Sequence, residues 1–490
     1  MDTTITENLG SLLKRVTGFD EFRRGQEEVI RSVIQGRDTI AVLPTGAGKS
    51  LCYQLPVHAL GGTVLIVSPL LSLMEDQVAQ LKMKGEKRVA ALNSFLAPKE
   101  RAEVLANLGR YRFLFTSPEM LVQPHISKRL KQLRIAYIVA DEAHCISQWG
   151  FDFRPDYLRM REWLAALEDR PPVLALTATA SEKAIRDIAD YLLMRQPELF
   201  IHTPDRPNIA MELVRLAGRE EKTEWILKNL LRWQGPGIIY VQSRKRAEEL
   251  AGHLRNREIH AAAFHAGMEG EDRILVQQQF LNGELEWICA TNAFGMGINK
   301  PDIRWIIHDH LPSSAAQYIQ EIGRAGRDGG QSLSTLLYSE GDADTAAFIA
   351  TDDLPEPETV HFIGKCLAEG MDIREAGELA GLSETALRVI SYWLDRLGTA
   401  QAAIQMDRLA KAKREEIQSM VQFAEGAGCI RSRALGLFGY SPTFRPAHCC
   451  SECGLDPAQI LTVRTTARNT AGLQGWRERI NSLFGVSAEE

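Results

Sequence analysis

Over its first two-thirds the chain alternates short apolar runs with longer segments of helical hydrophobic spacing. Apolar runs of about four to eight residues are typical of strands that a parallel sheet buries on both faces. Such runs predict strands at 39–43, 64–67, 112–115, 135–139, 174–180, 237–241, 261–264, 287–291 and 304–309. Residues 205–208 (D-R-P-N) divide these strands into two sets and are interpreted as a linker. The pattern therefore predicts an α/β fold with two parallel-sheet lobes.

The pattern changes in the last third of the chain. Residues 352–358 (D-D-L-P-E-P-E) form an acidic, proline-containing linker. Helical spacing across 372–398 predicts two helices, with Gly381 at the turn and Ser383 as the cap of the second. This is a helix-turn-helix pattern. Its second helix carries as many acids as bases, which favours a packing or winged-helix-like role over base reading. A further helix is expected at 410–423.

Composition adds two limits. The chain has 490 residues, 45% apolar and 24% charged, as is usual for a globular protein of three or four domains. Its net charge of −6 means that a nucleic-acid partner would have to be bound by local patches. No apolar run is long enough to span a bilayer, and the N-terminus lacks the pattern of a signal peptide. We therefore expect a cytoplasmic protein without a membrane partner.

A phosphate-binding loop follows the first predicted strand. Residues 44–50 read P-T-G-A-G-K-S, in the strand–loop–helix setting that such loops require. The strict pattern has Gly where Leu43 stands, but the core of the motif is intact. The candidate nucleotide-binding residues are Thr45, Gly46, Gly48, Lys49 and Ser50. The glycines let the backbone wrap phosphates, Lys49 supplies positive charge, and the Ser50 hydroxyl is a candidate Mg²⁺ ligand.

An acidic pair ends the strand at 135–139. Asp141 and Glu142 suit a metal ligand and a base that activates water, at the edge of the sheet where ligands bind. The segment that follows is aromatic and basic, with Trp149, Phe151, Phe153 and Arg154. Rings beside a guanidinium can stack with unpaired bases. The alternative is a surface turn with an ordinary core tryptophan.

Two further groups could complete a nucleotide site. In the segment 18–26, Phe19 and Arg23 could enclose a base and Gln26 could bind an adenine edge; the alternative is the start of an amphipathic helix. The second lobe has no phosphate loop, but Arg324 and Arg327 lie three residues apart and share a helix face. Such arginines suit an arginine finger. The alternative is an ordinary salt-bridged helix, although the glycines beside both arginines are poor helix formers.

The cysteines fall into two groups. Cys52, Cys145, Cys289 and Cys366 are scattered, whereas Cys429, Cys449, Cys450 and Cys453 cluster near the C-terminus. In a cytosolic protein such clustering favours zinc over disulfides. Four thiolates complete a tetrahedral site, and His448 is an alternative ligand to one of them.

The motifs together resemble the RecQ family of superfamily-two DNA helicases. They are F-R-R-G-Q, T-G-A-G-K-S, D-E-A-H-C-I-S-Q-W-G-F-D-F-R-P-D-Y, A-F-G-M-G-I-N-K and Q-E-I-G-R-A-G-R-D-G, in family order from Phe19 to Gly329. The resemblance implies that Phe19, Arg23 and Gln26 bind adenine, that Asp141 holds Mg²⁺ through water, and that Glu142 activates the attacking water. It implies that Gln320, Arg324 and Arg327 reach the γ-phosphate, and that residues 149–154 couple DNA to hydrolysis. Phe151 stands where some members have His, which leaves its role open.

The resemblance also implies a function. The cofactors would be ATP, Mg²⁺ and Zn²⁺, and the activity a DNA-dependent ATPase that unwinds DNA in the 3′-to-5′ direction. Single-stranded and forked duplex DNA would be the partners of a monomer, with a single-strand-binding protein as a further candidate, at the nucleoid if the source is bacterial. The rival functions are a translocase that does not separate strands and a non-catalytic DNA-binding scaffold. The similarity to the RecQ zinc module extends to Cys429, Cys449, Cys450 and Cys453.

We expect five regions. They are a nucleotide-binding lobe (1–204), a second lobe (205–350), a helical, winged-helix-like segment (351–405), a zinc module (406–455) and a tail (456–490). The residues that follow Cys453 are too few for both a winged helix and a further helical DNA-binding domain.

Overall fold

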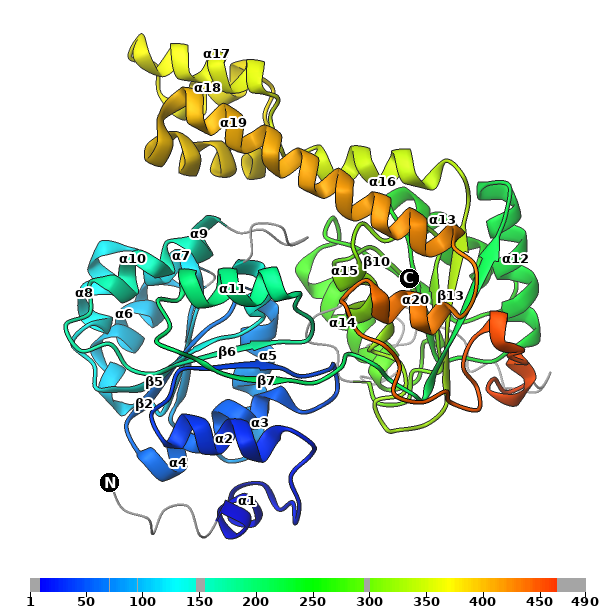
Figure 1. Ribbon diagram of the computed structural model, residues 1–490, viewed down its shortest axis with the longest axis horizontal. Coiled ribbons are helices and arrows are strands. Elements are labelled where there is room, and N and C mark those ends of the chain that lie inside the picture. The colour runs from blue at the N-terminus through cyan, green and yellow to red at the C-terminus, as the bar shows by residue number, and fades with distance from the viewer. Residues whose placement is uncertain (1–8, 70, 95, 147–154, 295–299, 465–490) are drawn as a thin grey trace, which may run out of the picture.

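The computed structural model describes residues 9–69, 71–94, 96–146, 155–294 and 300–464. Two parallel β-sheets stand side by side, each with helices against its faces, and a helical arm extends from the second lobe toward the first (Figure 1). The expectation of two parallel-sheet lobes is confirmed.

The first lobe contains a seven-stranded parallel sheet in the order β3-β4-β2-β5-β6-β1-β7. Its strands are β1 (Thr39–Val42), β2 (Thr63–Val67), β3 (Val89–Leu92), β4 (Phe113–Thr116), β5 (Ile135–Ala140), β6 (Val173–Thr177) and β7 (Glu198–Ile201). Successive residues of one strand face opposite sides of the sheet. Ile40 and Val42 accordingly join one apolar cluster, and Ala41 and Leu43 join another. Both faces of the sheet are therefore buried.

The helices of the first lobe flank this sheet. They are α1 (Leu9–Thr17), α2 (Gln26–Ile34), α3 (Lys49–Gln54), α4 (Pro56–Leu60), α5 (Leu71–Met83), α6 (Pro98–Ala106), η2 (Leu108–Arg110), α7 (Pro118–Leu121), α8 (Pro124–Leu130), η3 (Ala143–Ile146), α9 (Pro155–Leu158), α10 (Met160–Ala165) and α11 (Glu182–Tyr191).

The second lobe contains a six-stranded parallel sheet in the order β10-β11-β9-β12-β13-β8. Its strands are β8 (Ile209–Arg215), β9 (Gly237–Tyr240), β10 (Ala261–Phe264), β11 (Trp287–Ala290), β12 (Trp305–His308) and β13 (Ser332–Tyr338). Its helices are α12 (Arg219–Arg232), α13 (Arg244–Arg255), α14 (Gly270–Leu281) and α15 (Ala315–Ile322).

The arm consists of α17 (Pro357–Ala368), α18 (Ile373–Leu379) and the first segment of α19 (Glu384–Glu425), and α16 (Asp342–Thr351) connects it to the second lobe. Gly398 has non-helical angles (φ 70°, ψ 169°) and divides α19 into two helical segments. The turn between α18 and α19 is as expected, because Gly381 has φ +66° and the Ser383 side chain accepts a hydrogen bond from the Ala386 N–H.

Two expectations for this region change. Residues 351–405, all of which the structure describes, contain helices and no strand, so the segment has a helix-turn-helix without the β-hairpin of a winged helix. The helix expected at 410–423 is part of the second segment of α19, which runs without a break through residue 405. Because a domain boundary belongs where an element ends, we propose to move the boundary from 405/406 to Gly398.

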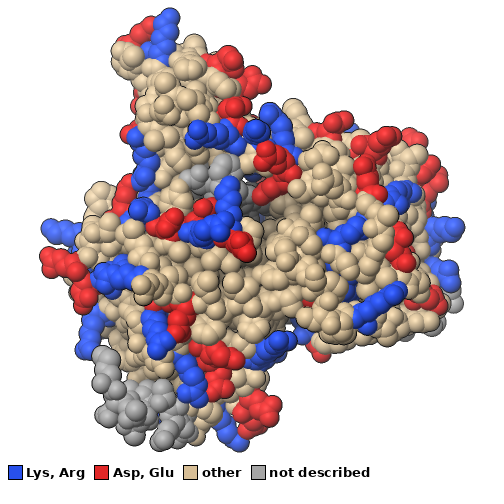
Figure 2. Space-filling model, in the orientation of Figure 1, with Lys and Arg blue, Asp and Glu red and all other residues tan. Residues whose placement is uncertain are grey.

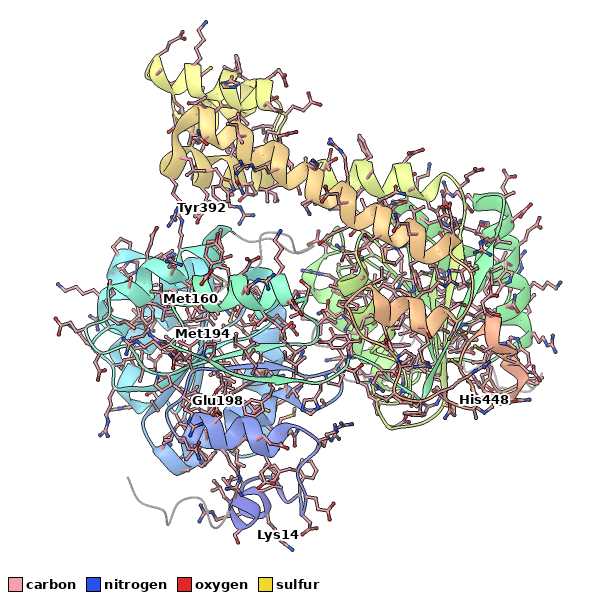
Figure 3. The ribbon with its side chains drawn as sticks, viewed as in Figure 1. Lys14, Met160, Met194, Glu198, Tyr392 and His448 are labelled. Atoms are coloured by element: carbon pink, nitrogen blue, oxygen red, sulfur yellow. The ribbon has the colours of Figure 1, made fainter. Side chains whose placement is uncertain are left out.

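The arm docks on the first lobe beside α9 and α10. Tyr392, on the side of the arm that faces the first lobe (Figure 3), lies with its ring centroid 4.7 Å from the Arg396 guanidinium and 5.8 Å from that of Arg159. Arg396 forms an ion pair with Glu162 on α10. Apolar residues of the arm share one cluster with Tyr157 and other residues of the first lobe. The arm therefore connects the second lobe to the segment that directly follows residues 147–154.

The cysteine-containing module covers an edge of the second sheet. It comprises α20 (Ile430–Gly436), η4 (Ser451–Cys453) and η5 (Pro457–Gln459). The Met211 N–H on the edge strand β8 donates to the Cys449 carbonyl at 3.1 Å. Residues 456–464, which the sequence assigns to the tail, also pack on this lobe, where the Gln234 N–H donates to the Thr462 carbonyl at 2.9 Å.

Positive and negative side chains are interspersed over the face seen in Figure 2, without one large patch of a single sign. This distribution matches the small net charge. Among the residues that the structure describes, no helix has both the length and the apolar character that crossing a bilayer requires.

Candidate active site between the two lobes

The phosphate loop follows β1 and ends where α3 begins at Lys49. Gly46 (φ +84°) and Gly48 (φ +78°) have left-handed backbone angles that favour glycine, as the motif predicts. The Lys49 Nζ atom is buried 3.6 Å from Glu142 Oε1, and it has no hydrogen-bond partner within the described part of the chain. Buried ammonium groups are costly unless they are paired and hydrogen-bonded. The geometry suits an additional anionic partner for Lys49.

Asp141 and Glu142 lie buried at the C-terminal end of β5, as expected. Glu142 has φ +48°, which is uncommon for a residue with a side chain, and its N–H donates to Asp141 Oδ1 at 3.0 Å. Burial and the neighbouring Glu142 charge raise the pKa of Asp141. Burial also acts to raise the pKa of Glu142, but the charges of Lys49 and His144 outweigh it, and that pKa is lowered. Glu142 is therefore the carboxylate that stays ionised beside Lys49.

Tyr157 connects this pair to the next segment. The hydroxyl of Tyr157 lies 2.7 Å from the Asp141 carbonyl and 2.9 Å from the Val67 carbonyl, within hydrogen-bond distance of both. Tyr157 lies on α9, directly after residues 147–154. The DNA-coupling residues predicted from sequence, Trp149, Phe151, Phe153 and Arg154, lie outside the described residues, so their role stays a prediction.

The candidate adenine-binding residues lie next to the phosphate loop. Gln26 is buried, and its Nε2 donates to the Ala47 carbonyl at 2.8 Å. Arg23 Nη1 donates to the Gly46 carbonyl at 2.5 Å. Phe19 is 60% exposed, which leaves its ring accessible to a base. The structure thus brings Arg23 and Gln26 against the phosphate loop, while Phe19 is exposed a few residues earlier in the chain.

The second lobe presents its arginines to the same loop. A side chain built at Gly46 would place its Cβ 3.8 Å from Arg327 Cγ. Arg324, just beyond α15, is buried and acts with the other charges to lower the pKa of Glu142. Burial, together with the charges of Arg324 and Arg206, lowers the pKa of Arg327 to about 10. Gln320 lies half-buried in the last turn of α15. Several cations thus converge here, an arrangement that a polyanion would stabilise.

The glycines beside the two arginines have structural reasons. A Cβ at Gly323 would lie 1.8 Å from the Thr45 Oγ1 atom of the phosphate loop, so this position requires a residue without a side chain. Gly326 has φ +54°, and a Cβ there would lie 2.5 Å from Asn208 Nδ2. Arg324 and Arg327 both lie beyond Ile322, the last residue of α15, so the expectation that they share a helix face is wrong, and so is the alternative of an ordinary salt-bridged helix.

Sequence reasoning missed two groups that position these residues. Glu321 is buried on α15, where its carboxylate lies 2.8 Å from His308 Nε2 and accepts a hydrogen bond from Gln317 Nε2 at 3.0 Å. The contact with His308 fixes α15 against β12, and the bond from Gln317 lies within α15. Arg206, in the segment interpreted as a linker, donates to carbonyls of both lobes. The sequence signal that could have pointed to Arg206 was the presence of charged residues at 205–206, between the two sets of predicted strands.

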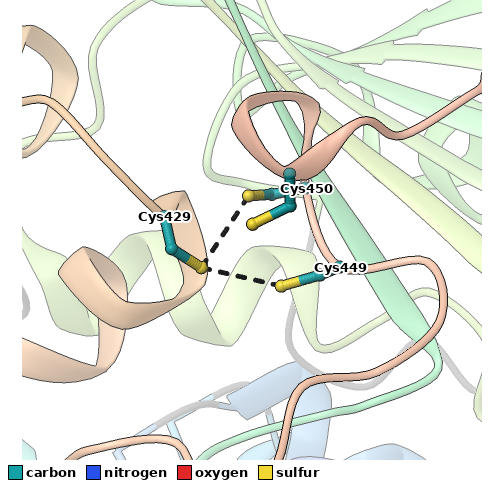
Figure 4. Close-up of side chains that lie close together, drawn as sticks. Cys429, Cys449 and Cys450 are labelled. Carbon is teal, nitrogen blue, oxygen red and sulfur yellow. Dashed lines mark hydrogen bonds between the residues drawn. The ribbon is translucent and has the colours of Figure 1, made fainter.

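The four clustered cysteines form the candidate metal site, and Figure 4 labels three of them, Cys429, Cys449 and Cys450. Their sulfur atoms all lie within 4.8 Å of one another, with Cys429 3.6 Å from Cys449 and 3.9 Å from Cys450. Tetrahedral zinc with Zn–S bonds of about 2.3 Å would separate its sulfurs by about 3.8 Å. The donor set and its spacing fit zinc. His448 is not one of the residues whose possible ligand atoms lie within this distance of one another.

Comparisons with known proteins agree with this arrangement. The DEAD/DEAH box helicase family matches residues 23–188, and the helicase conserved C-terminal domain matches residues 221–329. The chain is 42% identical to the probable ATP-dependent DNA helicase RecS of Bacillus subtilis over 98% of both chains. It is 41% identical to the ATP-dependent DNA helicase RecQ of Haemophilus influenzae over 71% of this chain and 56% of that protein.

Solved structures show the same fold. The helicase MrfA bound to DNA matches with a TM-score of 0.58 at 21% identity, over 71% of this chain and 53% of that one. Yeast (S. cerevisiae) Dbp5 bound to RNA and ADP BeF3 matches with a TM-score of 0.57 at 17% identity, over 70% of this chain and 90% of that one. The family matches cover the two lobes, and the similarity to RecS continues through the arm and the cysteine cluster. The chain therefore belongs to the RecQ family of superfamily-two helicases.

Proposed function

We propose that this chain is an ATP-dependent DNA helicase that moves 3′ to 5′ along one strand and separates the duplex ahead of it. The observation that carries the proposal is the convergence of Lys49 and the acidic pair from the first lobe with Arg324 and Arg327 from the second. A cleft that closes on ATP and opens after hydrolysis moves the lobes relative to each other. Family membership supports DNA as the substrate of that motion.

Each residue has a proposed part in hydrolysis. Phe19, Arg23 and Gln26 hold the base, while Thr45, Gly46 and Gly48 wrap the phosphates. Lys49 binds the outer phosphates, and Glu142 accepts the proton of the attacking water. Ser50 and Asp141 would hold Mg²⁺, which neutralises phosphate charge when bound. Gln320, Arg324 and Arg327 reach the γ-phosphate from the second lobe, where the arginines stabilise the charge that develops in the transition state.

We further propose that the four cysteines bind one zinc ion and that Trp149, Phe151, Phe153 and Arg154 couple base stacking to hydrolysis. Their link to the site would run through α9 and the contact between Tyr157 and the Asp141 carbonyl. Single-stranded and forked duplex DNA would be the substrates of a monomer, with a single-strand-binding protein as a partner. In a bacterium this activity would act on the nucleoid in the cytoplasm.

Strand displacement on a forked duplex tests the proposed function. We expect ATP-dependent separation of a fork with a 3′ single-stranded tail and none with a 5′ tail only, because the lobes track one strand in one direction. Hydrolysis should be stimulated by single-stranded DNA more than by RNA. Stimulated hydrolysis without displacement would favour the rival translocase. A chain that binds DNA without hydrolysing ATP would be a scaffold.

Replacing Arg327 by alanine should slow turnover and leave ATP affinity nearly unchanged. A finger acts on charge that develops in the transition state, and its loss typically lowers kcat by about 10³-fold or more. The measurement is kcat by steady-state hydrolysis, with nucleotide affinity by equilibrium titration. Arg257→Ala, an exposed arginine after α13, is the matched control and should behave as the unmodified protein. A collapse of affinity with normal turnover of bound ATP would make Arg327 a binding residue.

A further inference from the structure

The guanidinium of Arg206 lies between the catalytic loops of the two lobes. Its Nη1 donates to the Thr45 carbonyl of the phosphate loop at 2.9 Å and to the Gly323 carbonyl at 3.1 Å. Its Nη2 donates to the carbonyls of Ala325 at 3.1 Å and Gly326 at 2.7 Å. One side chain therefore holds the backbone on both sides of Arg324 against the phosphate loop.

The chemistry of these contacts favours arginine. Backbone carbonyls at and beyond the end of a helix have no hydrogen-bond donors inside that helix. After α15, the carbonyls of Gly323, Ala325 and Gly326 accept hydrogen bonds from the guanidinium of Arg206. Asn208 extends the contact, because its Nδ2 donates to the carbonyls of Gly326 and Gly330, each at 2.9 Å. Its Oδ1 accepts from Arg206 Nε at 3.3 Å. Residues 205–208, which we call the brace, thus support the loop that carries both finger arginines.

The cysteine module contacts the brace through Arg431. Arg431 on α20 is fully buried, forms an ion pair with Asp205, and donates to the Arg206 carbonyl at 3.2 Å and to the Ile209 carbonyl. A buried charge is tolerated only with such partners, so this position of Arg431 depends on the brace.

We propose that Arg206 is a positioning residue for ATP hydrolysis and that the cysteine module controls the hydrolysis rate by holding the brace through Arg431. The brace sets how Arg324 and Arg327 meet the phosphates. It does not itself bind the nucleotide, since its donors are used by backbone carbonyls. This inference rests on the proposed ATP site, and Lys49→Ala serves as its reference variant.

The first test replaces Arg206 by alanine. Because displacing a catalytic group by about 1 Å can cost about 100-fold in rate, single-turnover hydrolysis should fall about 100-fold. ATP affinity should change little, and Arg206→Lys should recover only part of the rate, because one ammonium cannot reach carbonyls of both loops. Normal hydrolysis in a folded Arg206→Ala variant overturns the proposal, as does loss of rate that is fully explained by loss of affinity.

The second test separates the module from the brace. Arg431→Met leaves the Asp205 carboxylate buried without its partner, so the double variant Asp205→Asn with Arg431→Met is the better-folded form. Both should retain zinc and ATP affinity but hydrolyse ATP about tenfold more slowly or worse, by the same misplacement of catalytic groups. Arg433→Met is the matched control, since Arg433 on the same helix donates to the Phe423 and Gly426 carbonyls at the end of α19 and not to the brace. Its hydrolysis should remain normal.

The readouts are zinc per chain, melting temperature, nucleotide affinity and single-turnover rate on the same preparations. The Arg433→Met variant could hydrolyse ATP as slowly as the double variant. The hydrolysis rate would then depend on the stability of the module alone, and the specific role of Arg431 would be overturned. Normal hydrolysis in the double variant overturns it as well. If Lys49→Ala remains active, the assigned ATP site is wrong; if it is inactive while the brace variants hydrolyse normally, only the brace is wrong.

Discussion

Replacing Lys49 by alanine is expected to abolish DNA-stimulated ATP hydrolysis while leaving DNA binding largely in place. The Lys49 ammonium is buried beside Glu142 without a hydrogen bond from the described residues, in a site where cations from both lobes converge. Removing one charged donor that stabilises developing negative charge in a buried site costs about 10²–10³-fold in kcat or more. DNA affinity depends on phosphate and base contacts elsewhere, so it should persist.

The measurement pairs hydrolysis with DNA binding on one preparation. The control is Lys84→Ala. Lys84 is exposed after α5, and its replacement by alanine removes the same charge from the chain. We expect the control to match the unmodified protein in both assays. DNA-stimulated hydrolysis that survives in Lys49→Ala would show that ATP is bound elsewhere in the chain.

The strands that the sequence pattern predicted are mostly the interior ones. β3, β7 and β8 were missed, and all three are edge strands. β7 alternates between half-buried and exposed positions, so it lacks the continuous apolar run of a strand buried on both faces. β13 is buried along its whole length but reads S-L-S-T-L-L-Y, and its polar residues hid it from a pattern based on apolar runs. The pattern therefore detects continuous apolar sequence, and it misses strands that alternate in burial or that bury polar residues.

The candidate site was predictable where one short motif supplies the chemistry. The phosphate loop and the acidic pair each lie within a few residues of sequence, and the structure brings them to one place. Arg206, Arg431 and Glu321 were not predictable, because their function depends on contacts between segments far apart in the chain. Charged side chains are rarely buried, so a sequence gives no reason to place Arg431 in the interior.

In the arm, too, local features could be predicted from the sequence and long-range contacts could not. Helix α18, the first segment of α19 and the turn between them followed from spacing and capping, both of which are local, whereas α17 was not predicted. Its docking against α9 and α10 rests on Tyr392, Arg396 and their partners in the first lobe, and no local pattern specifies those partners. The acids and bases of its second helix indicated a packing or winged-helix-like role over base reading, and the structure packs that helix against the first lobe without a wing.

The cysteine module should contain one zinc ion per chain, and its removal should unfold the module. The sulfur spacing matches a tetrahedral site, and the sulfurs are too far apart for a disulfide, whose S–S bond is about 2.05 Å. Small loop-rich modules derive much of their folding free energy from the metal. Because this module also pairs with the edge strand β8, its loss would expose that edge and promote aggregation.

Elemental analysis and thermal unfolding of matched cysteine variants test this expectation. Cys450→Ala removes a fully buried ligand and should eliminate bound zinc, lower the melting temperature and increase aggregation. Cys366→Ala, which removes a buried thiol from α17, should keep one zinc and melt within a few degrees of the unmodified chain. His448→Ala should also keep its zinc, because His448 stands outside the sulfur group. Protein purified without chelator that contains no zinc would refute the site, and zinc loss in the His448 variant would show that the histidine replaces one of the thiolates.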